Sequence, residues 1–361
     1  MLLSVLETLL IALLGGFLFS YLHTPLPWML GALTTVLLWN FLLKRKVCWP
    51  GKFANIGQII IGYTIGRTFT QETCQQIMTQ LPIMLIVTIV TVIFSLLLGY
   101  ITHKRTGISV ESGLIGSIPG GLSQTAVLCA EVPGSDITIV TVMQTARLLS
   151  VIFVVPFLAI HGLGYGSLTP TAVSTISTAT SILMPVSQKI LISGLVILSA
   201  ILAHRLGMPT PFLLGAVIGT ASIGLYGLKL PSLLQYWLDG AQLCIGAYTG
   251  ARINLGNLSN WRKILPYTLL GVIGLIFCSI GIAFLLMHFH HISLVTAFLS
   301  TAPGGMAEMG LTGMMLQADL SVIVAFQLFR LLFILMVLPP VLKWWLARNT
   351  ANKRRNKQKC G

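Results

Sequence analysis

The chain has 361 residues, of which 55% are hydrophobic and only 8% are charged. Soluble domains carry about 25% charged residues, so this composition excludes an ordinary soluble domain and is typical of a protein that crosses a membrane several times. The net charge of +14 comes mostly from short basic clusters between apolar segments, a pattern of cytoplasmic loops rather than of a nucleic-acid-binding face. We therefore expect the lipid bilayer as its surroundings and no nucleic acid as its partner.

Apolar segments follow one another along the whole chain, and most approach the ~20 residues that a helix needs to cross the hydrocarbon core. They run roughly over 3–22, 26–43, 54–70, 79–101, 110–130, 137–160, 188–204, 211–228, 240–254, 264–287, 293–314 and 320–346. We predict an all-α polytopic membrane protein with about 10–12 transmembrane segments. Its parts are a first repeat (1–160), a Ser/Thr-rich connector (161–187), a second repeat (188–348) and a basic cytoplasmic tail (349–361).

The two halves repeat one another at a constant offset, which places position 24 in register with position 208. "TPLPWMLGA" (24–32) matches "MPTPFLLGA" (208–216), "GQIIIGYTIG" (57–66) matches "AQLCIGAYTG" (241–250), and "GSIPGGLSQT" (116–125) matches "STAPGGMAEM" (300–309). After a slip of one position, the segments 136–156 and 319–339 share Asp, Gln, Arg and Pro in register. These matches predict an internal duplication.

Two relative orientations of the halves fit this pattern. If every segment crosses the membrane, each half has six spans and the halves are parallel. If 110–130 and 293–314 enter and leave on one side, each half has five crossings and the second half is inverted. With the basic tail inside, the inverted arrangement places fewer basic residues outside than the parallel arrangement does. Those that remain outside are Arg67, Lys189 and Lys229. The charge distribution therefore favours inverted repeats.

Each half contains a helix breaker in the middle of an apolar segment, Pro119-Gly120-Gly121 and Pro303-Gly304-Gly305. Proline removes a backbone donor and disfavours the helical conformation of the preceding residue, and the glycines permit a turn. Unwound backbone inside a membrane is tolerated only where protein buries it or where it lines a cavity. We predict a broken helix in each half. A kink that serves packing alone is the alternative, but a doubled break points more strongly to a transport site.

Glu308 lies four residues after Gly304, in the first turn of the half-helix that the break should start. An acidic residue within a membrane is costly and is usually functional. Glu308 is therefore a candidate proton- or cation-coupling group, with a structural ion pair as the alternative. Its counterpart in the first half is Gln124, which takes up no proton, so proton chemistry would be confined to the second half.

One glutamine and one arginine lie deep in the last span of each half: Gln144 with Arg147, and Gln327 with Arg330. Each arginine follows by eleven residues an aspartate, Asp136 or Asp319, that we predict to cap the helix. The glutamine lies three residues earlier on the same helical face. These groups suit an anionic or carboxylate ligand, or they satisfy carbonyls freed by the broken helix. The sequence leaves both uses open.

Twelve residues are therefore candidates for binding a substrate or ion: Pro119, Gly120, Gly121, Gln124, Gln144, Arg147, Pro303, Gly304, Gly305, Glu308, Gln327 and Arg330. The cluster His288, His290 and His291 lacks an acidic or cysteine neighbour and suits an interfacial loop better than a metal site. Nucleotide-binding and hydrolase motifs are missing from the sequence. We expect no catalytic residue, no metal and no cofactor.

The paired "PLPWMLGA"/"PTPFLLGA" segments, the paired "IPGGLSQ"/"APGGMAEM" breaks and the paired Gln-x-x-Arg spans resemble the AbrB-duplication family of bacterial membrane proteins. Members are often labelled AbrB-family regulators or ammonia monooxygenases. More distantly, the pattern is similar to the cation–proton antiporter and bile-acid symporter superfamily, whose inverted repeats contain crossed broken helices. That resemblance implies that both breaks lie at the crossover, near Glu308 and the two arginines. The chain lacks the paired aspartates that would imply sodium–proton exchange.

Taken together, these features predict a secondary transporter of the bacterial inner membrane, with a cytoplasmic C-terminus, that moves a small anionic or amino-acid-like solute or an ion with proton coupling through Glu308. A membrane-embedded regulator that affects gene expression through a partner is the alternative. A third hypothesis, membrane-bound oxidation, predicts bound copper or iron. The sequence is compatible with a homo-oligomer.

Overall fold

The structure is a computed structural model that describes residues 2–43, 47–120, 125, 128–129, 132, 134–163, 186–228, 230–253, 261–290 and 292–341. Within these ranges it contains thirteen α-helices, one short π-helix and no strand, which confirms the predicted all-α class. Six helical segments are long and apolar enough to cross a membrane. They comprise α1 (Leu2–Tyr21), α4 (Gln71–Thr106), α7 (Ile137–Leu158), α9 (Val186–Arg205), α12 (Trp261–His290) and α15 (Leu320–Met336).

The other helices are shorter and complete each half. They are α2 (Pro27–Leu43), α3 (Gly51–Gly66), α5 (Val110–Ser117), the π-helix η1 (Ala159–Leu163), α10 (Pro211–Leu225), α11 (Gln235–Arg252), α13 (Leu294–Thr301) and α14 (Met306–Met315). The starts of α1, α2, α3 and α5 correspond to those of α9, α10, α11 and α13 at the offset of the repeated motifs. The starts of α7 and α15 show the same slip of one position as the sequence matches.

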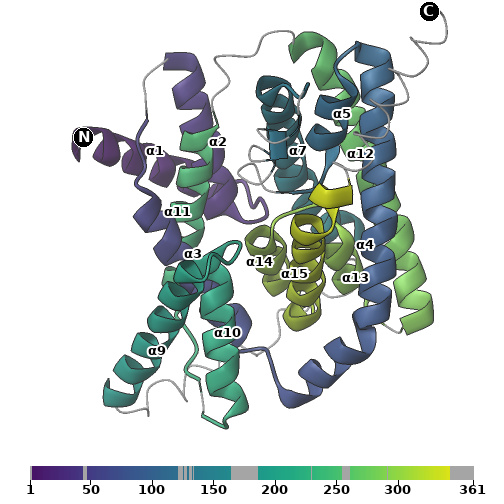
Figure 1. Cartoon of the computed structure of the whole chain (residues 1–361). Coiled ribbons are helices and arrows are strands. Elements are labelled where there is room, and N and C mark those ends of the chain that lie inside the picture. Colours follow the sequence, from purple (N-terminus) through teal and green to yellow (C-terminus); the bar gives the residue numbers. More distant parts are fainter. Residues whose placement is uncertain are drawn as a thin grey trace, which may run out of the picture.

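The helices pack as two lobes, and each lobe takes helices from both halves of the sequence (Figure 1). The first lobe contains α1, α2, α3, α9, α10 and α11, and the second contains α4, α5, α7 and α12–α15. Between them, Ile61 and Ile65 of α3 share an apolar cluster with Met306, Leu311 and Val324 of α14 and α15. The sequence halves are therefore not separate units in space.

The long helices α4 and α12, which occupy equivalent places in the two halves, pack side by side in opposite directions. Gly274 of α12 lies against Phe94 and Leu98 of α4, while Thr102, one turn later on α4, lies near Tyr267, two turns earlier on α12. Equivalent helices that run antiparallel are what inverted repeats require. This packing supports the inverted alternative over the parallel one.

In the first lobe the two halves interlock through equivalent glycines. Gly62 of α3 lies against the carbonyl of Leu213 on α10, and Gly246 of α11 lies against the carbonyl of Met29 on α2. Both contacts bring helix backbones together, as small residues do where membrane helices cross. The second half therefore buries one face of α2 and one face of α3.

We predict that Gly246→Ala lowers the stability of the protein, because the added Cβ would overlap the carbonyl oxygen of Met29. Overpacking of this kind costs about 1–3 kcal/mol, and a fall in the midpoint of thermal unfolding in detergent would reveal it. Gly281→Ala on α12 is the matched control, since its Cβ would meet no atom within 4 Å. Equal midpoints for the two variants would contradict this account of the interlock.

Candidate functional site

The break in the second half forms a hairpin of two short helices, α13 and α14. Asp319, just before α15, donates its backbone N–H to Thr296 Oγ1 near the start of α13 at 3.1 Å. Ala318 donates to the carbonyl of Gly313 near the end of α14 at 2.9 Å. Both ends of the hairpin thus lie at the start of α15. The segment predicted over 293–314 is not a continuous span: it enters and leaves at the same end of α15.

The first half has the corresponding contacts. Asp136, before α7, donates its backbone N–H to Ser112 Oγ at the start of α5 at 2.7 Å, and Ser135 Oγ donates to the carbonyl of Cys129 at 2.8 Å. Ser112 and Cys129, near the two ends of the predicted segment 110–130, therefore both lie at the start of α7. Of the predicted site residues, Gly121 and Gln124 lie outside the described residues.

The two aspartates cap their helices as predicted. Asp136 accepts from the backbone N–H of Thr138 at 2.8 Å, and Asp319 accepts from Ser321 at 3.0 Å and Val322 at 3.3 Å. A carboxylate there satisfies backbone donors at a helix start and faces the positive end of the helix dipole. Each cap fixes the start of the span that carries a glutamine and an arginine.

In the first half, Gln144 and Arg147 hold the end of α5 and the start of the break. Gln144 Nε2 and Arg147 Nη2 donate to the carbonyls of Ile118 and Gly120, both at 2.9 Å. Arg147 Nη2 also donates to Gln144 Oε1 at 2.6 Å, as their shared face predicts. The pair reaches five backbone carbonyls in all: those of Ile115, Gly116, Ser117, Ile118 and Gly120.

Gln327 and Arg330 repeat this arrangement in the second half. Gln327 Nε2 donates to the carbonyl of Leu299 at 2.8 Å, and Arg330 Nη1 donates to the carbonyl of Ala302 at 2.7 Å. The five carbonyls, each the repeat counterpart of one in the first half, are those of Leu299, Ser300, Thr301, Ala302 and Gly304. We call each glutamine–arginine pair a clamp.

The clamps satisfy the need that the breaks create. The last four carbonyls of a helix have no partner within it, and α5 and α13 both end inside the second lobe. A cation at a helix C-terminus also faces the negative end of the dipole. Arg147 and Arg330 are only 7% and 6% exposed, so their charges are balanced by these ends. The sequence leaves two roles open for these arginines, binding an anionic ligand or donating to carbonyls that the break frees. The contacts of the described residues support the second role.

Two serines that the sequence analysis does not include complete the clamps. Ser95 Oγ of α4 donates to the carbonyl of Ser117 at 2.5 Å, and Ser279 Oγ of α12 donates to the carbonyl of Thr301 at 3.2 Å. The two serines correspond to one another at the offset of the repeat. A serine at equivalent positions of two apolar spans was the sequence signal that could have identified both as site residues.

The breaks lie close to one another. Gly120 of the first break packs against Ile334, which is one turn beyond Arg330 on α15, and Arg330 holds the second break. Arg147 and Arg330 are near enough to interact electrostatically. The structure thus brings both breaks and both clamps together beside the boundary of the two lobes, where Gly310 of α14 lies against Ile65 of α3.

Glu308 lies at the N-terminus of α14, which begins directly after the second break. The side chain is partly buried and folds back over Gly305, so that a Cβ on Gly305 would overlap Glu308 Oε2. The sequence analysis gives a structural ion pair as the alternative role of Glu308. Among the described residues, Glu308 forms no ion pair. The carboxylate instead lies where the helix dipole and first-turn N–H groups favour a negative charge.

Comparison with known proteins agrees with the repeated motifs. Residues 28–346 match the family model described as "Transition state regulatory protein AbrB". The chain is 27% identical over 342 residues to "Uncharacterized protein YhjN" of Bacillus subtilis (strain 168), covering 90% of this chain and 89% of that protein. It is also 27% identical over 335 residues to "Putative regulator AbrB" of Escherichia coli (strain K12), covering 90% and 92%. The family model matches most of the chain, whose helices suit several membrane crossings. The chain therefore belongs to the AbrB family.

Proposed function

We propose that this protein is a secondary transporter of the bacterial inner membrane, with its C-terminus in the cytoplasm, and that it catalyses no reaction. Its substrate would be a small anionic or amino-acid-like solute. The observation that carries the proposal is the pair of clamped breaks beside the lobe boundary. Paired broken helices in inverted repeats are the usual basis of a transport site, and motion of one lobe against the other gives alternating access.

The clamps determine which groups remain for the solute. The guanidinium groups of Arg147 and Arg330 donate to carbonyls at the ends of α5 and α13. We therefore assign them to stabilising these helix ends rather than to direct solute contact. Among the described residues, the N-terminus of α14 is the positive helix end that directly follows a break. Half-helix N-termini bind anionic groups of substrates in transporters of this kind.

Glu308 then gives a simple route to proton coupling. Its carboxylate covers Gly305 at the α14 N-terminus, the place that an anionic solute would occupy. Protonation of Glu308 would remove the competing negative charge, so a solute carboxylate would bind together with a proton. We therefore propose proton–anion symport, in which Glu308 is the coupling group and Gln124 has no corresponding role.

Solute flux into proteoliposomes tests the proposal. Purified protein should accumulate at least one component of a pooled set of radiolabelled metabolic acids and amino acids above the level of empty liposomes, and a pH gradient should increase the uptake. Uptake that never exceeds that of empty liposomes, for protein that elutes as a folded species, would exclude the transport function.

The alternative function is a membrane-embedded regulator, favoured by the name of the Escherichia coli relative, "Putative regulator AbrB". A regulator that acts through a partner needs a contact surface outside the membrane, and the basic tail 349–361 is a candidate. Deletion of residues 350–361 should abolish the output of a regulator in a reporter assay. The same deletion should leave the flux of a transporter largely unchanged.

A further inference from the structure

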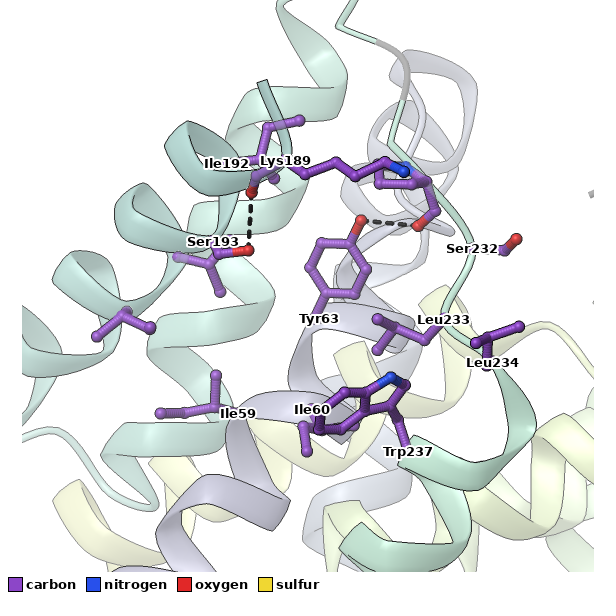
Figure 2. A pocket seen from close by; sticks show the side chains of 13 residues that line it. Ile59, Ile60, Tyr63, Lys189, Ile192, Ser193, Ser232, Leu233, Leu234 and Trp237 are labelled. Atoms are coloured by element: carbon purple, nitrogen blue, oxygen red, sulfur yellow. Dashed lines mark hydrogen bonds between the residues drawn. The ribbon is translucent and has the colours of Figure 1, made fainter. Parts of the chain in front are cut away.

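A groove of about 580 Å³ lies in the first lobe between α3, α9 and the segment 231–237 (Figure 2). This volume is in the range of ligand sites, about 300–1,000 Å³. Its walls are mostly aliphatic, with Ile59 from α3, Ile192, Val196 and Ile197 from α9, and Leu233 opposite them. None of the residues that line the groove belongs to a clamp or to a hairpin.

One end of the groove is polar. Lys189 extends across it above the ring of Tyr63, whose hydroxyl donates to the carbonyl of Pro231 at 2.7 Å (Figure 2). Trp237 lies at the other end, below Leu233. Among the described lining residues, Lys189 alone is charged and none is acidic. The groove therefore has one cationic end and a long apolar interior.

The place that is equivalent by the repeat, between α1 and α11, is filled with side chains. At the offset of the repeat, Trp49 takes the place of Leu233, Val5 that of Lys189 and Ala247 that of Tyr63. Trp49, Val5, Ala247, Leu243 and Ala12 share one apolar cluster, and Trp49 is 8% exposed. The groove between α3 and α9 is thus a departure from the repeat, and it carries the charged Lys189 where the filled place has Val5.

The groove lies beside the surface of the protein that lipid would cover. Ile190 and Leu191, the neighbours of Lys189 on α9, are 67% and 62% exposed. One turn beyond Tyr63, Arg67 borders a second hollow of about 530 Å³, and its buried Nε has no hydrogen-bond partner among the described residues. Arg67 and Lys189 are two of the basic residues that the inverted arrangement leaves outside, and both lie near Tyr63.

We propose that this groove binds one acyl chain of an anionic phospholipid, with the headgroup phosphate on Lys189. Charge complementarity selects the headgroup, because a phosphate that lacks a compensating amine gains most from an ammonium group. The apolar interior selects a chain, because its aliphatic walls gain packing contacts with methylene groups and would leave a buried polar ligand without hydrogen-bond partners. From Lys189 to Ile197, α9 rises about 12 Å at about 1.5 Å per residue, so part of one chain fits.

Native mass spectrometry of the full-length, delipidated protein in detergent tests this site. The protein is titrated with phosphatidylglycerol or with phosphatidylcholine of the same acyl chains. We expect wild type to retain one phosphatidylglycerol in preference to phosphatidylcholine. Lys189→Val, which copies the first half, should weaken phosphatidylglycerol binding about fivefold, the effect of one basic residue near an anionic lipid, and should leave phosphatidylcholine binding unchanged.

Two further variants make the result specific. Leu233→Trp copies Trp49 of the first half and should fill the groove, so that both lipids are lost. Lys52→Val removes a lysine outside the groove and should change neither. Equal binding of the two lipids by wild type would overturn the headgroup assignment. Unchanged lipid binding by folded Leu233→Trp would overturn the site.

Discussion

Arg330→Ala is expected to stop the protein from accumulating as a folded, monodisperse species. The variant leaves the carbonyl of Gly304 and Oε1 of Gln327 without the guanidinium that donates to them. The carbonyls of Thr301 and Ala302 lose one donor each but keep those from Ser279 and Gln327. An unsatisfied buried group costs about 1–3 kcal/mol, so two such losses are a large part of the stability of a typical protein, about 5–15 kcal/mol. Size-exclusion elution and thermal unfolding of a fluorescent fusion in detergent would measure the effect.

Two further substitutions separate the clamp from general effects of charge. Arg330→Lys keeps the charge but lacks the planar fork that reaches several carbonyls, so we expect an intermediate unfolding midpoint. Arg105→Ala removes an exposed arginine at the end of α4 and should behave as wild type. If Arg330→Ala eluted and unfolded as Arg105→Ala does, the clamp would not support the break.

Glu308→Gln is expected to abolish the response of solute uptake to a pH gradient while the protein still binds and exchanges its solute. The amide is nearly the same size as the carboxylate and copies its protonated form, so the α14 N-terminus remains available to an anion. Gradient-driven uptake in proteoliposomes should fall at least about tenfold, as expected when a transition between two protonation states is lost. Exchange of internal for external labelled solute, without a gradient, should persist.

A matched pair of controls keeps this result interpretable. Glu72→Gln removes a carboxylate at the start of α4 and should leave gradient-driven uptake intact. Gly305→Ala should displace the Glu308 carboxylate, because the new Cβ would overlap Oε2, and should impair coupling without removing the acid. Full gradient response in Glu308→Gln would assign coupling to another group.

The sequence predicts those features that a local pattern determines. The Pro-Gly-Gly breaks, the aspartate caps and the pairing of Gln144 with Arg147 follow from helix geometry and from backbone groups that proline and glycine leave free. The position of the second break in its apolar segment predicts two short half-helices, and α13 and α14 have eight and ten residues. The partners of the arginines could not be chosen in advance, because a freed carbonyl and a bound anion suit a guanidinium equally well.

Features that depend on three-dimensional packing escape the same reasoning. Nothing in α3 indicates that Gly62 meets Leu213 of the other half, since apolar spans fit many neighbours equally. The bounds of α4 are also longer than predicted, Gln71–Thr106 rather than 79–101, because the polar residues at its two ends continue the helix beyond the apolar part. The sequence also does not indicate that the groove at Lys189 is open while its repeat counterpart around Trp49 is filled. This difference appears only when the packing of the two places is compared.

The interlocking of the first lobe has a consequence for synthesis on the ribosome. Met29 reaches its partner Gly246 only after more than half of the chain has been translated. At about 5–20 residues per second, a delay of roughly 200 residues is on the order of 10–40 s. During this time α2 can pack against α1, but α2 and α3 lack the faces of α10 and α11 that cover them in the finished protein. The first half must therefore remain in the membrane with these faces uncovered until the second half follows it.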